Sequence, residues 1–161
     1  MPESPQAALP EAGPTPAVLD TQVVLDWLWF DDARAAALGR AVRSGHLRWI
    51  WTAAMREELA HVLPRLRPSA SGISCEHVLT LCSEIASRAN PPRVAALRCT
   101  DPSDQKFVDL ALSVSGTWLF SRDRAVLKLA RRAAPLGCRI VEPGRLAGQA
   151  EAFTSARRPG P

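Results

Sequence analysis

The sequence predicts an α/β fold built on a mostly parallel sheet. Two observations point to it: short apolar runs typical of buried strands alternate with longer segments whose apolar residues recur at helical spacing. Strands that are separated by helices pair in parallel, and such a sheet is covered by helices on both faces. We therefore expect a three-layer α/β/α sandwich.

The first half of the chain supplies two of the expected strands and three of the helices. They are a strand at 17–19, a helix that begins after Asp20, a helix over 32–42, a strand at 47–52 and a helix over 53–63. Thr21 is expected to cap the first helix, and Gly45 to end the second.

The second half of the chain continues the alternation. The expected elements are a helix over 76–89, a short strand at 94–97, a helix over 104–115, a strand at 117–121, a basic helix over 123–133 and a strand at 138–141. The segment Asp101-Pro102-Ser103-Asp104 is typical of a helix start, with Ser103 or Asp104 as the cap.

Length and composition favour one folded domain. The chain has 161 residues, of which 47% are hydrophobic, which is enough to bury one core. Residues 1–16 contain five prolines and are expected to form a disordered leader. The expected domain then covers 17–145, and a flexible tail follows over 146–161.

Several classes of protein are excluded by the same composition. No apolar run approaches the ~20 residues of a membrane-spanning helix, and the start of the chain lacks the features of a secretory signal, so we expect a cytoplasmic protein away from membranes. The four cysteines have no zinc-site spacing and are expected to be small buried side chains. The net charge of +4 permits an anionic partner but does not by itself indicate one.

Acidic residues follow the predicted strands, at the edge of the sheet where ligands of α/β proteins collect. Asp20 comes directly after the first strand, Asp104 lies beyond the strand at 94–97, and Asp123 follows the strand at 117–121. Glu58 lies two turns into the helix after the second strand. These four carboxylates are expected to converge.

Carboxylates held close together repel one another and therefore call for a cation. Oxygen ligands favour Mg²⁺ or Mn²⁺, which can activate a water and hold a phosphate for in-line attack. The alternative is that each residue is structural, because an Asp at a helix start is more often a cap than a ligand. Asp104 in particular fits a cap, and Asp26, Asp31, Asp32 and Asp109 are assigned as solvated or capping residues.

Four segments resemble the PIN-domain family in their order and spacing. They are Val18-Leu19-Asp20-Thr21-Gln22, Thr52 to Leu63 with Glu58, Asp101-Pro102-Ser103-Asp104-Gln105-Lys106-Phe107, and Leu119-Phe120-Ser121-Arg122-Asp123. The resemblance is closest to bacterial PIN proteins described as toxin components of toxin-antitoxin pairs. In this family the acidic positions correspond to Asp20, Glu58, Asp104 and Asp123.

The resemblance implies a metal-dependent ribonuclease that cuts RNA, often as a homodimer and, for a toxin, with an antitoxin partner. It implies that Asp20, Asp104 and Asp123 bind Mg²⁺ or Mn²⁺, and that Glu58 binds the ion or orients the attacking water. Two departures from the family pattern stand out. Gln22 replaces Asn, which affects the hydrogen bonds around Asp20, and Ser121 replaces Thr but keeps the hydroxyl.

Further residues are assigned around these four. Thr21, Gln22, Asp101 and Ser121 are expected to support the metal ligands, although an Asp before Pro is more often a turn former. Three basic residues beside the last acidic position are expected to contact the RNA backbone: Arg122, Arg124 and Lys128.

Two other functions fit parts of the pattern. A PIN-like protein without turnover would bind RNA or act as a scaffold, and the departure from the family pattern at Gln22 favours this alternative. A phosphatase of the haloacid dehalogenase type also has an Asp after its first strand. That chemistry needs a second Asp two residues later, where this chain has Gln22.

Overall fold

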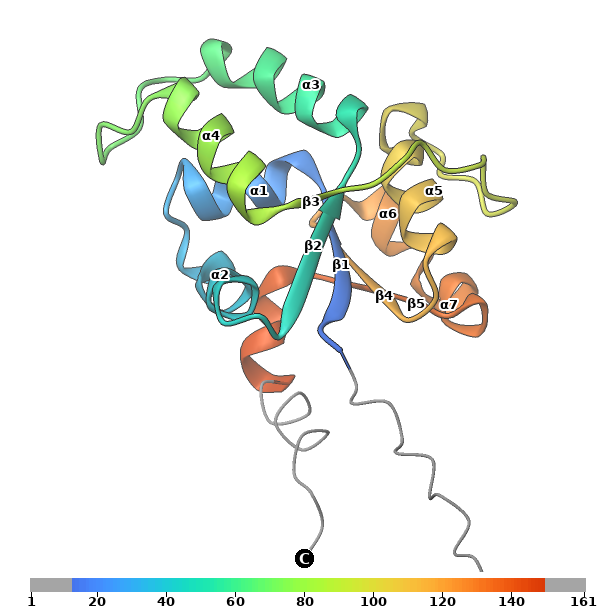
Figure 1. Ribbon diagram of the computed structural model, residues 1–161. Coiled ribbons are helices and arrows are strands. Elements are labelled where there is room, and N and C mark those ends of the chain that lie inside the picture. The colour runs from blue at the N-terminus through green and yellow to red at the C-terminus, as the bar shows by residue number, and fades with distance from the viewer. Residues whose placement is uncertain (1–12, 150–161) are drawn as a thin grey trace, which may run out of the picture.

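The computed structural model describes residues 13–149, in which a five-stranded sheet runs through the middle of the protein (Figure 1). Its strands are β1 (Thr15–Leu19), β2 (Leu47–Trp51), β3 (Ser87–Arg88), β4 (Thr117–Phe120) and β5 (Cys138–Val141). They lie in the order β3-β2-β1-β4-β5, and every neighbouring pair is parallel. The prediction of a mostly parallel sheet is confirmed.

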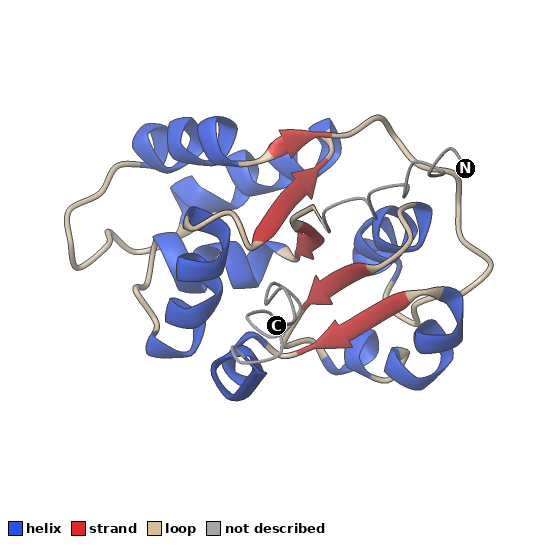
Figure 2. Cartoon of the chain, turned by 60° about the horizontal axis from the view of Figure 1, so that its bottom comes forward, coloured by secondary structure: helices blue, strands red, loops and turns tan. Residues whose placement is uncertain are grey.

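Helices lie on both sides of this sheet, as Figures 1 and 2 show from two directions. The α-helices are α1 (Thr21–Leu28), α2 (Ala36–Arg43), α3 (Ala53–Val62), α4 (Cys75–Ile85), α5 (Gln105–Ser113), α6 (Arg124–Leu127) and α7 (Ala130–Ala133). Short 3₁₀ turns extend them: η1 (Ala33–Ala35), η2 (Leu63–Arg65), η3 (Pro102–Asp104), η4 (Ala134–Leu136) and η5 (Pro143–Gln149). The predicted α/β/α fold is therefore confirmed.

The central strand β1 is buried on both faces. Ala17, Val18 and Leu19 are all nearly inaccessible to solvent, as a parallel strand between two helical layers requires. The largest fully buried side chains in the same core are Trp49, Phe107 and Phe120. Burying these aromatic and aliphatic groups is the main stabilising contribution to the fold.

The strand order creates a crevice beside β1. The chain proceeds from β1 outward through β2 to β3, and later returns to the opposite side of β1 with β4 and β5. Ligands of open α/β sheets bind where the strand order reverses in this way, outside the carboxyl ends of the strands. Asp20 follows β1 directly and Asp123 follows β4, so both lie at this point.

The boundaries of the folded region differ from those predicted. Thr15 and Pro16, expected in a leader, are part of β1, where their backbones pair with Leu47 and Arg48. At the other end η5 runs beyond residue 145, and Leu146, expected in a flexible tail, is 3% exposed. The predicted leader residues 1–12 and tail residues 150–161 lie outside the described residues.

The strand expected at 94–97 is absent, and β3 takes its place in the sheet. Helix α4 ends at Ile85 instead of residue 89, so that Ser87 and Arg88 pair with β2. The segment at 94–97 is a loop in which Val94 is 70% exposed. Side chains of α5 hold this loop: Asp109 accepts a hydrogen bond from the Ala95 amide at 2.8 Å.

Two local predictions need correction. Asp20, not Thr21, caps α1, because the Asp20 carboxylate accepts a hydrogen bond from the Val23 amide. The basic helix expected over 123–133 is split into α6 and α7. At the break the Leu129 amide bonds to Val126, three residues back, which tightens the turn.

The remaining class predictions concern membranes and cysteines. Among residues 13–149, no helix is long and apolar enough to cross a membrane. All four cysteines are free thiols, and Cys82, Cys99 and Cys138 are buried, as predicted for small core side chains. Burial raises the pKa of Cys82 to about 12 and that of Cys138 to about 11, so these thiols stay protonated.

Candidate metal centre

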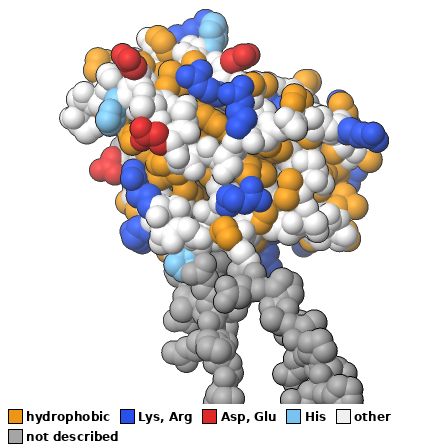
Figure 3. All heavy atoms as spheres, in the orientation of Figure 1, with side chains coloured by type: hydrophobic (Ala, Val, Ile, Leu, Met, Phe, Trp, Pro, Cys, Tyr) orange, Lys and Arg blue, Asp and Glu red, His pale blue; other side chains and the backbone are white. Residues whose placement is uncertain are grey.

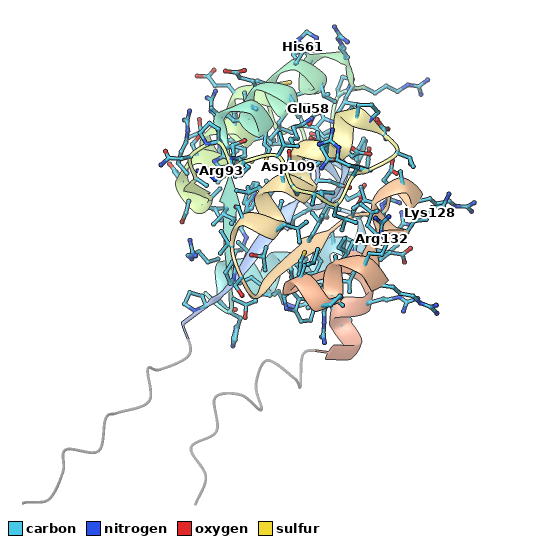
Figure 4. The ribbon with its side chains drawn as sticks, turned by 90° about the vertical axis from the view of Figure 1, so that its right-hand side faces the viewer. Glu58, His61, Arg93, Asp109, Lys128 and Arg132 are labelled. Atoms are coloured by element: carbon cyan, nitrogen blue, oxygen red, sulfur yellow. The ribbon has the colours of Figure 1, made fainter. Side chains whose placement is uncertain are left out.

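A cavity of about 550 Å³ opens at the carboxyl ends of β1 and β4. The four predicted acidic residues all line it: Asp20, Glu58, Asp104 and Asp123. In Figure 4, Glu58 on α3 lies against the body of the protein, whereas His61 lies at the outer rim of the same helix. The expectation that these carboxylates share one pocket agrees with their placement.

Asp20 is buried at the floor of the cavity and is 4% exposed. One carboxylate oxygen accepts from the Val23 amide at 2.8 Å, and the other accepts from the Ser121 hydroxyl. Burial raises the pKa of Asp20 to about 6, although these two hydrogen bonds favour the ionised form. Neighbouring carboxylates raise this pKa further, since a like charge disfavours ionisation.

Asp104 has a carboxylate oxygen with no partner. Its Oδ2 atom is buried and makes no hydrogen bond, and the side chain does not cap α5 although the residue occupies the cap position. Burial raises the pKa of Asp104 to about 6, and the charges of Asp123, Asp101 and Asp20 add to the effect. The capping role considered from the sequence is therefore wrong for Asp104.

Asp101, Asp104 and Asp123 form an aspartate trio, in which one carboxylate oxygen of each lies within 4.8 Å of the others. Asp101 accepts from the amide of Ser103 at 3.0 Å, and Asp123 accepts from the amide of Ala125 at 2.7 Å. These caps fix both side chains while leaving other lone pairs free. Asp101, expected from the sequence to support the metal ligands, therefore lies close enough to Asp104 and Asp123 to be a candidate ligand itself.

Glu58 lies outside the trio and has its own partners. The Thr21 hydroxyl donates to Glu58 Oε2 at 2.6 Å, and the Lys106 ammonium is 3.2 Å from Glu58 Oε1. Thr21 therefore supports an acidic residue of the pocket, although it holds Glu58 rather than Asp20. Lys106 was not singled out in the sequence, where its only signal is its position two residues after Asp104.

Residues 16–125 match a family model described as PIN domain, which covers every element that lines the cavity. The chain belongs to the PIN-domain family. No curated protein sequence matches the chain. PIN domains are generally nucleases that use a divalent metal, so the cavity belongs to a nuclease-type domain.

One wall of the PIN-domain cavity carries an ion pair that is partly buried. Asp26 is 4% exposed, and its Oδ2 atom lies 2.7 Å from Nε of Arg122. Its Oδ1 atom accepts from Arg122 Nη2 at 3.0 Å and from the side-chain amide of Gln22 at 2.9 Å. The assignment of Asp26 as a solvated or capping residue was therefore wrong. Gln22, expected to act on Asp20, bonds to Asp26 instead.

The other three acidic residues set aside from the sequence behave differently from one another. Asp32 caps η1 by accepting from the Arg34 amide, as predicted. Asp31 is exposed and has a positive φ of 48°. Asp109 is partly exposed and is not a cap, because it binds the 94–97 loop and the Gln105 side chain.

The basic residues assigned to RNA fall into two groups. Arg122 lines the cavity, but its guanidinium is already paired with Asp26. Arg124 and Lys128 are exposed on or next to α6, and Figure 4 shows Lys128 directed away from the body of the protein. On the face shown in Figure 3, acidic side chains gather toward the upper left and basic ones are more widely spread.

Proposed function

We propose that this PIN domain is a metal-dependent endoribonuclease that cleaves RNA phosphodiester bonds in the cavity. The observation that carries the proposal is the Asp104 carboxylate, whose buried Oδ2 atom has no partner and lies among other carboxylates. A protein keeps a buried carboxylate oxygen unsatisfied at a cost in stability, which a bound cation offsets.

The residues of the cavity fit Mg²⁺ or Mn²⁺. Every candidate ligand is a carboxylate oxygen, the type that hard divalent cations prefer, and there is no thiol or imidazole among the lining residues. The aspartate trio would hold the ion, with Asp20 at its side. When bound, the ion would lower the pKa of a water and offset the negative charge of the phosphate.

Side chains of the cavity would accept a proton, position the ligands and bind the phosphate. Glu58, oriented by Thr21 and Lys106, would accept a proton from the attacking water. Ser121 would keep Asp20 in place through its hydroxyl, and its neighbour Arg122 would present the unpaired side of its guanidinium to the phosphate. Arg124 and Lys128 would contact the RNA backbone beyond the cavity.

The biological setting is proposed from the resemblance to toxin components of bacterial toxin-antitoxin pairs. In that setting the protein acts on RNA in the cytoplasm, forms a homodimer and is neutralised by an antitoxin protein. Arrest of bacterial growth on expression of the wild-type chain, and normal growth on expression of Asp20→Asn, supports a toxin. Equal growth with both chains contradicts it.

Cleavage of a labelled single-stranded RNA by the purified protein tests the enzymatic proposal. With Mn²⁺ the wild-type chain is expected to cut the RNA, and removal of the ion or the substitution Asp20→Asn is expected to reduce the rate at least about 100-fold. Asp31→Asn, on an exposed loop, serves as the matched control and should cut normally. Cleavage without metal, or cleavage unaffected by Asp20→Asn, overturns the mechanism. RNA binding without cleavage indicates the scaffold alternative.

A further inference from the structure

The acidic residues of the cavity differ in how their charge is offset. Of the ion pairs among residues 13–149, none involves Asp20 or the aspartate trio. Glu58 is the exception, because the Lys106 ammonium lies 3.2 Å from its Oε1 atom. The cavity therefore contains one carboxylate that already has a cation beside it.

Lys106 is held in this place by more than Glu58. Its ammonium also donates to the backbone carbonyl of Ser103 at 2.5 Å and lies 5.0 Å from the centre of the Phe107 ring. A carboxylate, a carbonyl and an aromatic face are three groups that attract an ammonium ion. The side chain is 28% exposed, so water reaches it only in part.

The same short segment places Lys106 and most of the aspartate trio. Asp101 and Asp104 bracket η3, and Lys106 is the second residue of α5, which follows directly. The positions of the ammonium and of these two carboxylates are therefore fixed together.

The residue type supports a specific use of this cation. The chain has 18 Arg but only two Lys, Lys106 and Lys128. Lys carries a compact point charge with three donors, whereas Arg spreads its charge over a planar fork. Lys106 is the one that lies beside the cavity, where its compact ammonium pairs with Glu58.

We propose that Lys106 takes the place of a second divalent ion, so that the cavity uses one metal ion at the aspartate trio and an ammonium at Glu58. This inference rests on the proposed function. A divalent ion on Glu58 would lie within a few ångströms of the ammonium, and the two positive charges would repel each other. Lys106 is accordingly a positioning residue, which pairs with Glu58 and orients it beside the single metal ion.

The number of Mn²⁺ ions bound per chain tests the inference. Titration followed by calorimetry and by the electron paramagnetic resonance of free Mn²⁺ should give one ion for the wild-type chain. Lys106→Met, which removes the charge and keeps the length of the side chain, should bind a second ion at Glu58. Lys128→Met, the matched control at the exposed lysine, should still bind one. Lys106→Arg, which keeps the positive charge, should also still bind one.

Two results overturn the inference: two ions bound to the wild-type chain, or Lys106→Met with one ion and an unchanged affinity. If the wild-type chain binds one ion but cuts no RNA, the proposed function fails and the one-ion cavity stands. If it binds no Mn²⁺ at all, both proposals fail. Circular dichroism of each variant establishes that it is folded before the titration.

Nuclear magnetic resonance of the lysine side chains gives a direct reading of the Lys106 position. With only two lysines, ¹³C labelling gives two ε-carbon signals, and Lys128→Met assigns them. Glu58→Gln should shift the Lys106 signal and leave that of Lys128 in place. One bound Mn²⁺ should broaden the Lys106 signal far more than the Lys128 signal. A Lys106 signal that responds to neither change contradicts its place in the cavity.

Discussion

Two aspartates at opposite ends of α1 show two ways to bury a carboxylate. Asp20 and Asp26 are each 4% exposed, yet their surroundings differ in charge. Asp26 has an ion pair with Arg122 and a hydrogen bond from Gln22. Asp20 has only neutral donors, the Ser121 hydroxyl and the Val23 amide, and burial raises its pKa to about 6.

Two adjacent residues that follow β4 bind the two aspartates. Ser121 donates to Asp20, and Arg122 pairs with Asp26. Arg122 directly follows Ser121, yet its positive charge pairs with Asp26 in the wall of the cavity and not with Asp20. A carboxylate that is buried and deprived of a nearby cation is typical of a functional site, whereas a fully paired one is typical of a structural role. The unpaired charge at Asp20 and Asp104 therefore supports the proposed cation site.

The largest effect is expected from breaking the pair in the wall. Asp26→Asn removes the negative partner of Arg122, which is 31% exposed, and leaves its charge partly buried. In the absence of divalent ions, the free energy of unfolding is expected to fall by about 3 kcal/mol, as measured by urea denaturation.

Asp32→Asn is the matched control for this prediction. The Arg34–Asp32 ion pair has the same length of 2.7 Å, but the Arg34 side chain is 61% exposed. Because water screens this pair, and because Asn also caps a helix, the control should lower the free energy of unfolding far less than Asp26→Asn does. Equal losses in the two variants contradict the structural role of the Asp26–Arg122 pair.

The same substitution at Asp20 is expected to act in the opposite direction. Without divalent ions at pH 7, Asp20→Asn should raise the free energy of unfolding by roughly 2 kcal/mol, because it removes a buried charge with no counter-ion. Asn retains an oxygen for the Val23 amide, so the cap of α1 is kept. Since this loss of charge also weakens metal binding, saturating Mn²⁺ should stabilise the wild-type chain more than the variant.

The pH dependence of stability distinguishes this cause from a simple packing effect. The pKa of Asp20 is about 6 in the folded protein, against 3.8 as the ordinary value, so the folded state binds this proton more tightly. Without metal, the Asp20 contribution therefore makes the wild-type chain less stable as pH rises from about 4 to about 6. The advantage of Asp20→Asn should shrink over the same range as pH falls. An advantage that is constant between pH 4 and pH 7 contradicts the assignment.

The positions of some acidic residues can be predicted from the sequence, whereas the partners of others cannot. Asp20 and Asp123 follow β1 and β4, so the topology of a parallel sheet brings them to one edge, where local patterns suffice to find them. Asp104 opens α5 instead, because the strand expected before it at 94–97 is absent. Asp26 and Asp32 look alike in the sequence, as acidic residues near helix ends. Only the structure distinguishes them, because the partner of Asp26 lies 96 residues away.

The same limit explains the errors in the fold. The apolar run at 94–97 has the composition of a strand, but β2 is already paired by Ser87 and Arg88, two exposed polar residues without strand character. Pairing at the edge of a sheet depends on which backbone is nearby, and periodicity does not report this. Lys106 was missed for a related reason, since a lone Lys on a helix gains meaning only from Glu58, which lies on another helix.

The smallest expected effect concerns Gln22, the residue that departs from the family pattern. Its side-chain amide donates to Asp26 at the wall of the cavity, so Gln22→Ala should lower the free energy of unfolding by about 1 kcal/mol, the value of one hydrogen bond from an exposed side chain. In the Asp26→Asn background the same substitution should cost measurably less, because the two residues share one bond. The pH dependence of stability attributed to Asp20 should be the same in the wild-type chain and in the Gln22→Ala variant. A shift of that pH dependence in the Gln22→Ala chain would show that Gln22 acts on Asp20. The distinction between the ion-paired Asp26 and the unpaired Asp20 would then be wrong.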